Sequence, residues 1–125
     1  MYSTEAGNLM LSSSVDWTVK LWNWKSLNKD PICSLEVWED YVYDVKWSYL
    51  YPSLFAVVDG DGNLDLWDLN KSSESPDVRS KVSNCSLNKV AWSPLGARLA
   101  TGSLDGYVEV FSHDKERERE LNFRF

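Results

Sequence analysis

The sequence predicts an all-β protein built from repeated antiparallel sheets of four strands each. Two separate sequence blocks recur at a spacing of 44–45 residues, and their segments alternate polar and apolar residues in period two. Such alternation, in stretches rich in β-branched and aromatic residues, is typical of strands. A repeat of about 40–45 residues is typical of the four-stranded blades of a β-propeller. We therefore expect a propeller fold.

The first repeated block marks the hairpin between the second and third strands of each unit. It reads "SVDWTVKLWNW" from residue 14, "VDGDGNLDLWDL" from residue 58 and "GSLDGYVEVFSH" from residue 102. Its turns contain aspartates that lie 45 and 44 residues apart, namely Asp16, Asp61 and Asp105. Six residues after each aspartate comes a large aromatic residue: Trp22, Trp67 and Phe111. We expect these aromatic residues to fill the space between sheets.

The second repeated block marks the first strand of two units. "YDVKWSYLYPSLFAVVDG" from residue 43 matches "NKVAWSPLGARLATGSLDG" from residue 88, which places Trp47 and Trp92 45 residues apart. The shared spacing predicts the same packing role for both indoles.

Ten strands are expected from these patterns. They cover residues 8–13, 18–24, 31–36, 42–48, 54–58, 63–69, about 77–82, 87–93, 97–102 and 107–112. The first unit then lacks its innermost strand, and the third lacks a clear outermost one, although the alternation in "ELNFRF" could add a strand.

The expected organisation is a partial propeller over residues 1–112, with about two and a half to three blades. The blades span about 8–37, 38–82 and 83–112, and a charged tail follows over 113–125. An open array of blades presents apolar faces and unpaired strand edges. We therefore expect either a fragment of a longer propeller or self-association.

The composition excludes several classes of function. The formal net charge is −6 and the sequence pI about 4.7, so the chain lacks the basic surface that binds nucleic acid or anionic lipid. The beginning of the chain resembles no signal peptide, and no apolar run could span a bilayer. Cys33 and Cys85 show no metal-binding spacing and are expected to be reduced thiols. These features predict a cytoplasmic protein without nucleic-acid or membrane partners.

Catalytic chemistry and cofactors are not expected. His113 is the only histidine, which leaves no material for a Ser-His-Asp triad or a histidine metal site. Residues 59–65 carry carboxylate and amide groups at alternate positions, as a calcium loop does. However, Leu64 and Asn70 stand where that loop needs glycine and glutamate. We expect no metal site.

The repeats resemble WD repeats, in which a Trp-Asp dipeptide ends the third strand. Trp67-Asp68 is the intact dipeptide, Trp22-Asn23 is close to it, and Phe111-Ser112 is degenerate. WD repeats also carry a Gly-His pair before the first strand, whose histidine joins a buried Asp–His–Ser/Thr–Trp network. Here Val37-Trp38 and Val82-Ser83 occupy those positions. We therefore expect each turn aspartate to accept hydrogen bonds from backbone N–H groups of its own turn.

Longer segments resemble the C-terminal propeller of cytoplasmic dynein intermediate chains. They are "SSVDWTVKLWN", "DYVYDVKWS" and "LFAVVDGDGNLDLWDLN", while "LNKVAWSPLGARLATGSLDGYVEVF" fits the last blade more loosely. The resemblance implies a non-catalytic scaffold of a minus-end-directed microtubule motor, which binds the dynein heavy chain. Other dynein subunits bind regions that precede the propeller in that family and are absent here. The alternatives are a WD-repeat adaptor of another complex and a truncated, non-functional fragment.

A partner-binding surface is expected where the second-to-third strand turns meet the connections into the innermost strands. It combines exposed aromatic residues with acidic neighbours, which suits a partly basic helical partner. The candidate residues are Trp17, Trp38, Glu39, Asp40, Tyr41, Tyr43 and Tyr107. Packing of the connection itself is the alternative explanation for the aromatic residues between 38 and 43.

Overall fold

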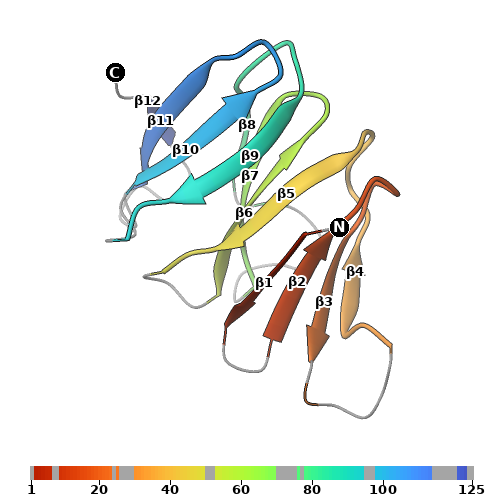
Figure 1. Cartoon of the computed structure of the whole chain (residues 1–125). Coiled ribbons are helices and arrows are strands. Elements are labelled where there is room, and N and C mark those ends of the chain that lie inside the picture. The colour runs from red at the N-terminus through yellow and green to blue at the C-terminus, as the bar shows by residue number, and fades with distance from the viewer. Residues whose placement is uncertain are drawn as a thin grey trace.

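The computed structural model describes residues 2–6, 9–23, 25, 30–49, 53–69, 76, 78–94, 98–113 and 121–123. These residues form strands, turns and bends but no helix. The strands make three antiparallel sheets of four strands each, arranged side by side (Figure 1). The fold is a partial WD-repeat β-propeller of three blades, which confirms the predicted fold class.

In each sheet the strands follow one another in chain order. The first sheet contains β1 (Tyr2–Ala6), β2 (Leu9–Ser13), β3 (Val19–Asn23) and β4 (Cys33–Leu35). The second sheet contains β5 (Val42–Trp47), β6 (Leu54–Asp59), β7 (Asn63–Asp68) and β8 (Val78–Lys81). The third sheet contains β9 (Leu87–Trp92), β10 (Arg98–Ser103), β11 (Val108–His113) and β12 (Leu121–Phe123). The ten predicted strands are all present.

Two strands were not predicted with the others. The expectation that the first sheet lacks its innermost strand is wrong, because β1 pairs with β2 from Tyr2↔Ser13 to Ala6↔Leu9. The "YSTEA" segment mixes residues that favour strands, Tyr2 and Thr4, with residues that do not, so pairing with β2 decides its conformation. At the other end, β12 pairs with β11 through Phe111↔Phe123. The segment predicted as a tail therefore contains an outermost strand.

The innermost strands of the three blades lie next to one another. Strand β5 contacts both β1 and β9. Hydrogen bonds also join β5 to β9: the Asp44 carboxylate accepts from the backbone N–H of Val90 at 3.0 Å in the core, and the Trp92 indole donates to the Lys46 carbonyl at 3.1 Å in a partly buried position. These side chains fix the third sheet against the second.

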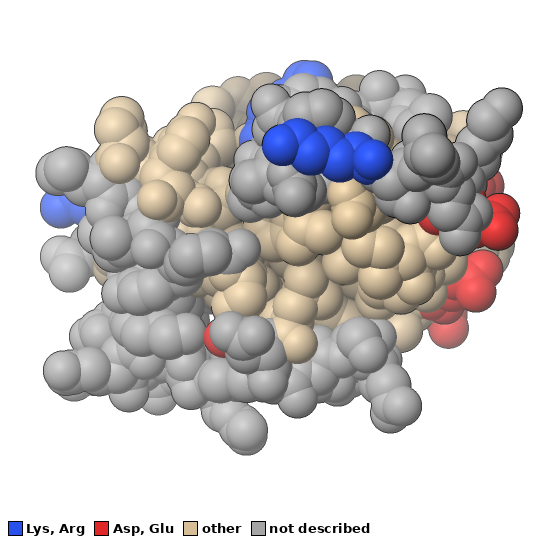
Figure 2. Space-filling view, turned by 90° about the horizontal axis from the view of Figure 1, so that it is seen from below, with Lys and Arg blue, Asp and Glu red and all other residues tan. Residues whose placement is uncertain are grey.

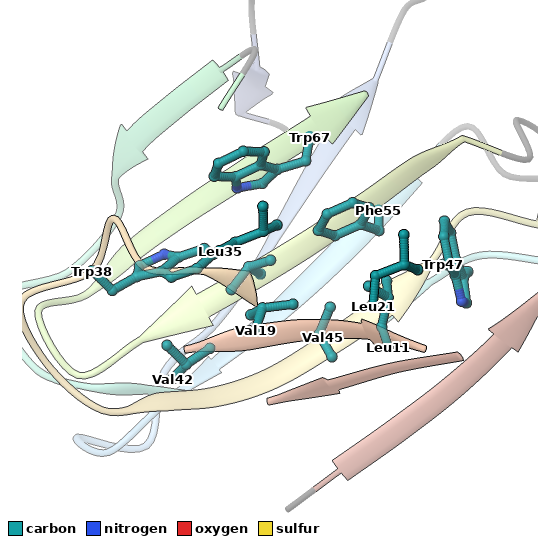
Figure 3. Packing of buried hydrophobic residues seen from close by; sticks show 11 residues of the cluster. Leu11, Val19, Leu21, Leu35, Trp38, Val42, Val45, Trp47, Phe55 and Trp67 are labelled. Carbon is teal, nitrogen blue, oxygen red and sulfur yellow. The ribbon is translucent and has the colours of Figure 1, made fainter. Parts of the chain in front are cut away.

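Two hydrophobic clusters fill the spaces between the sheets. The first lies between the first and second sheets (Figure 3) and includes Leu11, Val19, Leu21, Trp47, Phe55 and Trp67. In it, Phe55 stacks on Trp67 with ring centroids 6.1 Å apart. The second cluster lies between the second and third sheets and includes Leu54, Val58, Leu66, Trp92, Leu99 and Phe111. The middle sheet is therefore covered on both faces.

The aromatic residues at repeated positions are buried with one exception. Trp47, Trp67, Trp92 and Phe111 are buried as predicted, whereas Trp22 remains partly exposed. Trp67 packs toward the first sheet, and Trp22 occupies the same position one repeat earlier. Among the described residues, no further sheet covers the face of the first sheet that carries Trp22. Burial here depends on a neighbouring blade, which the local pattern of Trp22 does not reveal.

A repeated Ser/Thr–Trp pair is complete in only the first sheet. There the indole N–H of Trp22 donates to the Ser12 hydroxyl at 2.9 Å. In the second sheet Val57 stands at the register position of Ser12, and the indole N–H of Trp67 has no partner among the described residues. In the third sheet Thr101 is present, but the residue at the tryptophan position is Phe111, which has no N–H to donate.

Replacing Val57 with threonine is expected to stabilise the fold. Threonine has nearly the volume of valine, and its hydroxyl would accept from the indole N–H of Trp67 as the Ser12 hydroxyl accepts from Trp22. We therefore expect a gain of about 0.5–1.5 kcal/mol in the free energy of unfolding. Val58→Thr is the matched control, because Val58 is also fully buried but faces the third sheet. Denaturant titration compares the two variants. Equal losses of stability in both would contradict the proposed pairing.

Candidate partner-binding site

One end of the molecule gathers three hairpin turns and two connections, which we call the loop face. The loop face consists of the turns at 14–18, 60–62 and 104–107 and the connections at 36–41 and 82–86. Figure 1 shows the β2–β3, β6–β7 and β10–β11 turns along the same end of the three sheets. The segments are brought together although they are far apart in sequence.

Backbone hydrogen bonds join these segments into one continuous surface. The first turn bonds the start of β5, directly after the first connection, through Val42 N to Ser14 O at 3.2 Å. The first connection itself bonds the second turn through Gly60 N to Tyr41 O at 2.8 Å. The second connection bonds the third turn through Leu104 N to the carbonyl oxygen of Ser86 at 2.9 Å. Because the contacts are made by the backbone, they hold the loop face in place independently of its exposed side chains.

Glycine is required at one of these contacts. Gly62 has φ +82°, and a Cβ atom there would lie 2.0 Å from the Ser83 carbonyl oxygen. The Gly62 N–H donates to the Asp59 carbonyl oxygen at 3.2 Å, and the Gly62 carbonyl oxygen accepts from the N–H of Val82 at 2.8 Å. The second turn and the second connection can therefore pack closely only with glycine at this position.

The turn aspartates act differently in the three repeats. Asp16 accepts from Thr18 N at 3.1 Å and from the Thr18 hydroxyl at 2.6 Å, as expected for an aspartate that serves its own turn. The Thr18 hydroxyl lowers the pKa of Asp16. In the second turn this role belongs to Asp59 and not to Asp61, because Asp59 accepts from the N–H groups of Asp61 and Asn63 at 3.1 and 2.9 Å. The repeat alignment predicted Asp61 as the acceptor of this turn, whereas the acceptor is Asp59, two residues earlier.

The third turn relies on a side-chain hydroxyl. The Ser103 hydroxyl donates to the carboxylate of Asp105 and lowers the pKa of that carboxylate, which is exposed. Asp105 is therefore charged at neutral pH.

Asp59 is expected to make the stability of the chain depend on pH. Burial raises the pKa of this carboxyl above its ordinary value of 3.8, because removal from water disfavours the charged form. A raised acid pKa favours the fold at low pH, and this contribution is lost as pH rises from 3.8 through the higher folded pKa. Relative to the wild type, the Asp59→Asn variant should therefore gain stability as pH rises to 7. Denaturant titrations at several pH values test this, and a constant difference between the two proteins would contradict it.

A three-residue network, in which Asp65 and Trp38 are buried and Arg79 is 40% exposed, holds the connection 36–41. The Asp65 carboxylate on β7 is fully buried, and its oxygens accept from Nε and Nη2 of Arg79 on β8 at 2.9 and 2.8 Å. The indole N–H of Trp38 donates to the same carboxylate at 2.8 Å. The hydrogen bonds that the Arg79 guanidinium donates to Asp65 raise its pKa. Asp65 thus ties the connection to two strands of the second sheet.

Trp38 is therefore placed in the core. Its side chain is 4% exposed, and its ring lies 5.6 Å from that of Trp67 (Figure 3). For this residue the structure favours the alternative explanation, packing of the connection itself. Asp40 is partly buried and accepts from Tyr41 N at 2.7 Å, while Glu39 is exposed.

The other predicted aromatic residues are exposed on the loop face. Trp17 and Tyr41 are each 46% exposed, and Tyr107 is 68% exposed. Tyr43 is 37% exposed and packs edge-on against Tyr41, with ring centroids 6.1 Å apart. A register shift in β5 at this position, a β-bulge, turns Tyr43 outward and Asp44 inward. The structure thus exposes four of the predicted aromatic contact residues at one end of the molecule and brings two of them, Tyr41 and Tyr43, into contact.

Sequence reasoning missed three further exposed residues of this surface. Val15, Leu104 and Val108 are each more than half exposed and lie in or next to the turns. The repeat alignment contained a signal for two of them, because Val15 and Leu104 directly precede the turn aspartates Asp16 and Asp105. An apolar residue at that position has no core to enter. Together with the aromatic residues, these side chains give the loop face most of the large exposed hydrophobic groups of the described residues.

The charges of the molecule are unevenly distributed. Figure 2 shows the end opposite the loop face, where most visible acidic side chains gather at the right-hand edge, apart from the Lys and Arg side chains. On the loop face, Glu39 and Asp105 are exposed, and the exposed Asp16 pairs with Lys20 at 3.3 Å. This end of the molecule combines negative charge with exposed aromatic rings.

The described residues contain no group of three or more His, Cys, Asp or Glu side chains placed to hold a metal ion. The side chain of His113 lies outside the described residues. Cys33 and Cys85 are free and partly buried, and burial raises the pKa of the Cys33 thiol. Within the same part of the chain, no helix is long and apolar enough to cross a membrane.

Comparison with known proteins identifies the family. The family model described as "Eukaryotic translation initiation factor eIF2A" matches residues 10–122. The chain belongs to this WD-repeat family. Among curated proteins, the cytoplasmic dynein 1 intermediate chain of Drosophila melanogaster is 44% identical over 110 residues. The match covers 87% of this chain and 16% of that relative, so the WD-repeat chain spans about a sixth of the relative's length. The predicted resemblance to dynein intermediate chains is confirmed.

Proposed function

We propose that this WD-repeat chain is a non-catalytic scaffold of the cytoplasmic dynein complex and binds the dynein heavy chain through its loop face. The observation that carries the proposal is the 44% identity to a dynein intermediate chain across nearly the whole chain. In this role the chain supports minus-end-directed transport in the cytoplasm and lies on microtubules with the motor. Contacts with other dynein subunits belong to regions outside this chain.

The loop face has the properties of a protein-binding surface. Large aromatic side chains supply much of the binding energy of protein interfaces, and they act best when a rigid scaffold holds them. Here Trp17 and Tyr107 project from turns and Tyr41 from a connection, in segments of the loop face that backbone hydrogen bonds join. The acidic neighbours favour a partner helix that carries basic residues.

Capture of the heavy chain from cytosol tests this proposal. The wild-type chain should retain the dynein heavy chain, and Tyr41→Ala should retain several-fold less, since truncation of an aromatic contact residue commonly costs about 1–2 kcal/mol of binding free energy. Tyr49→Ala is the matched control, because Tyr49 is 73% exposed but lies outside the loop face. Trp38→Ala is expected to weaken binding only through loss of folded protein. Failure of the folded wild-type chain to retain heavy chain would contradict the proposal.

The description of the family model supports a second candidate, a WD-repeat adaptor of a translation complex. The net charge of this chain is −6, which argues against direct RNA binding. In this second role the chain would therefore contact the protein components of the complex. Ribosomal subunits retained in the same capture experiment, without heavy chain, would favour this candidate.

Light scattering on the purified chain tests the predicted self-association, which would cover the exposed face of the first sheet at Trp22. A monomer in solution would contradict this prediction.

A further inference from the structure

A small polar pocket opens on the loop face at the third turn. Its volume is about 30 Å³, and it is lined by Val82, Ser83, Leu87, Thr101, Ser103, Asp105, Tyr107 and Glu109. Leu87 and Thr101 are buried at its base, whereas Asp105 and Tyr107 are exposed at its mouth. The pocket thus has room for one small polar group that enters from the loop face.

The base of the pocket contains a hydroxyl group that lacks a partner. Thr101 is 2% exposed, and its Oγ1 makes no hydrogen bond among the described residues. Leaving a buried hydroxyl without a partner destabilises the fold. The neighbouring strand β11 explains why the Thr101 hydroxyl lacks a partner. Phe111 stands there at the position where the other two sheets have a tryptophan with an indole N–H donor. A group that enters the pocket can satisfy this hydroxyl.

The charge of the lining selects the kind of group. Asp105 and Glu109 bring two carboxylates, Ser83 and Ser103 bring hydroxyls, and none of the lining residues is basic. A primary ammonium group is compact and offers three N–H donors, whereas the planar guanidinium of arginine is larger and less suited to this volume. We propose that the pocket binds the ammonium group of a lysine side chain.

The surroundings of the mouth suit the rest of a lysine side chain. Tyr107 is 68% exposed and lines the pocket, and the adjacent Leu104 and Val108 are 70% and 67% exposed. The methylene groups of lysine pack along apolar surface while its charged end stays in a polar site. The lysine belongs to the protein that occupies the loop face, so in this respect the inference rests on the proposed function.

Titration of the 125-residue chain with n-butylammonium, followed by NMR at low salt, tests the pocket without the partner. We expect saturable shifts of the backbone amide signals of Ser83, Ser103 and Tyr107. Tetramethylammonium has the same charge but no N–H donor, so it should leave these signals nearly unchanged. Glu109→Gln should weaken butylammonium binding about tenfold, because it removes a charged acceptor. Thr101→Val, which keeps the shape of the side chain, should weaken it several-fold.

Asp16→Asn is the matched control, since it removes one negative charge from another turn of the loop face. It should leave the affinity for butylammonium unchanged. Equal responses to the two cations, equal effects of Glu109→Gln and Asp16→Asn, or no saturation would overturn the inference. The titration uses no heavy chain, so its failure is distinct from failure of the capture experiment. Amide signals of the first sheet report whether each variant is folded.

Discussion

Replacing Arg79 with methionine is expected to destabilise the chain by about 3–5 kcal/mol. Methionine keeps an unbranched side chain but removes the guanidinium that makes two hydrogen bonds to Asp65. Asp65 is fully buried, so its negative charge would keep the indole N–H of Trp38 as a hydrogen-bond donor but would have no counterion. A buried charge without its counterion costs far more than an exposed ion pair contributes. Denaturant unfolding measures the loss.

The double variant Asp65→Asn/Arg79→Met provides the control. Asparagine has an uncharged oxygen that can still accept from Trp38, so the double variant should recover more than half of the stability lost in Arg79→Met. Such non-additivity is expected for residues in direct contact. If the double variant were less stable than Arg79→Met alone, the buried charge would not be the cause of the destabilisation.

The second large effect is expected at Asp44, which links the second and third sheets. Its carboxylate is fully buried and accepts from the backbone N–H groups of Val45 and Val90, both at 3.0 Å. Asp44→Ala leaves these two donors without their acceptor, and we expect a loss of about 2–4 kcal/mol. Because Val90 lies on β9, the third sheet should loosen first.

Amide hydrogen exchange measures this local effect directly. In Asp44→Ala, exchange at Val90 and along β9 should accelerate more than exchange along β2 and β3. Asp61→Ala is the control, since Asp61 is partly exposed in a turn and its loss should change stability by less than about 0.5 kcal/mol. Uniform acceleration across all three sheets would contradict a specific role of Asp44 between the second and third.

Features that repeat were predictable from the sequence. The spacing of the two blocks located ten strands, and the shared positions of Trp47, Trp67 and Trp92 marked residues that the structure buries between sheets. Even the bulges recur: the register shifts involve Tyr43 in β5 and its repeat equivalent Asn88 in β9. Period-two alternation and repeat register are local signals, so they survive without knowledge of the tertiary fold.

Features that depend on long-range contacts were not predictable in this way. Strand β1 has mixed intrinsic strand propensity and forms by pairing with β2. Trp22 has the same local pattern as Trp67 but lacks a covering sheet in the described structure. Trp38 looked like a contact residue because it stands in a connection, yet its indole reaches a carboxylate 27 residues away. The sequence contains no local signal for that pairing.

The candidate site was predicted in part. The sequence located the turns and connections of the loop face and four exposed aromatic residues, but not the apolar residues beside them. The lysine pocket requires the third sheet to be assembled, because its lining comes from the 82–87 segment and from β10, β11 and their turn. Its unpartnered hydroxyl at Thr101 becomes visible only once the register of β10 and β11 is known.

Hydrogen–deuterium exchange of the chain, alone and with dynein heavy chain, tests whether the loop face is the binding surface. We expect slower exchange of backbone amides in the turns at 14–18, 60–62 and 104–107 and in the connections at 36–41 and 82–86. Exchange near Tyr49, which lies outside the loop face, should not change. Protection near Tyr49 with no change on the loop face, or no protection anywhere, would contradict the account.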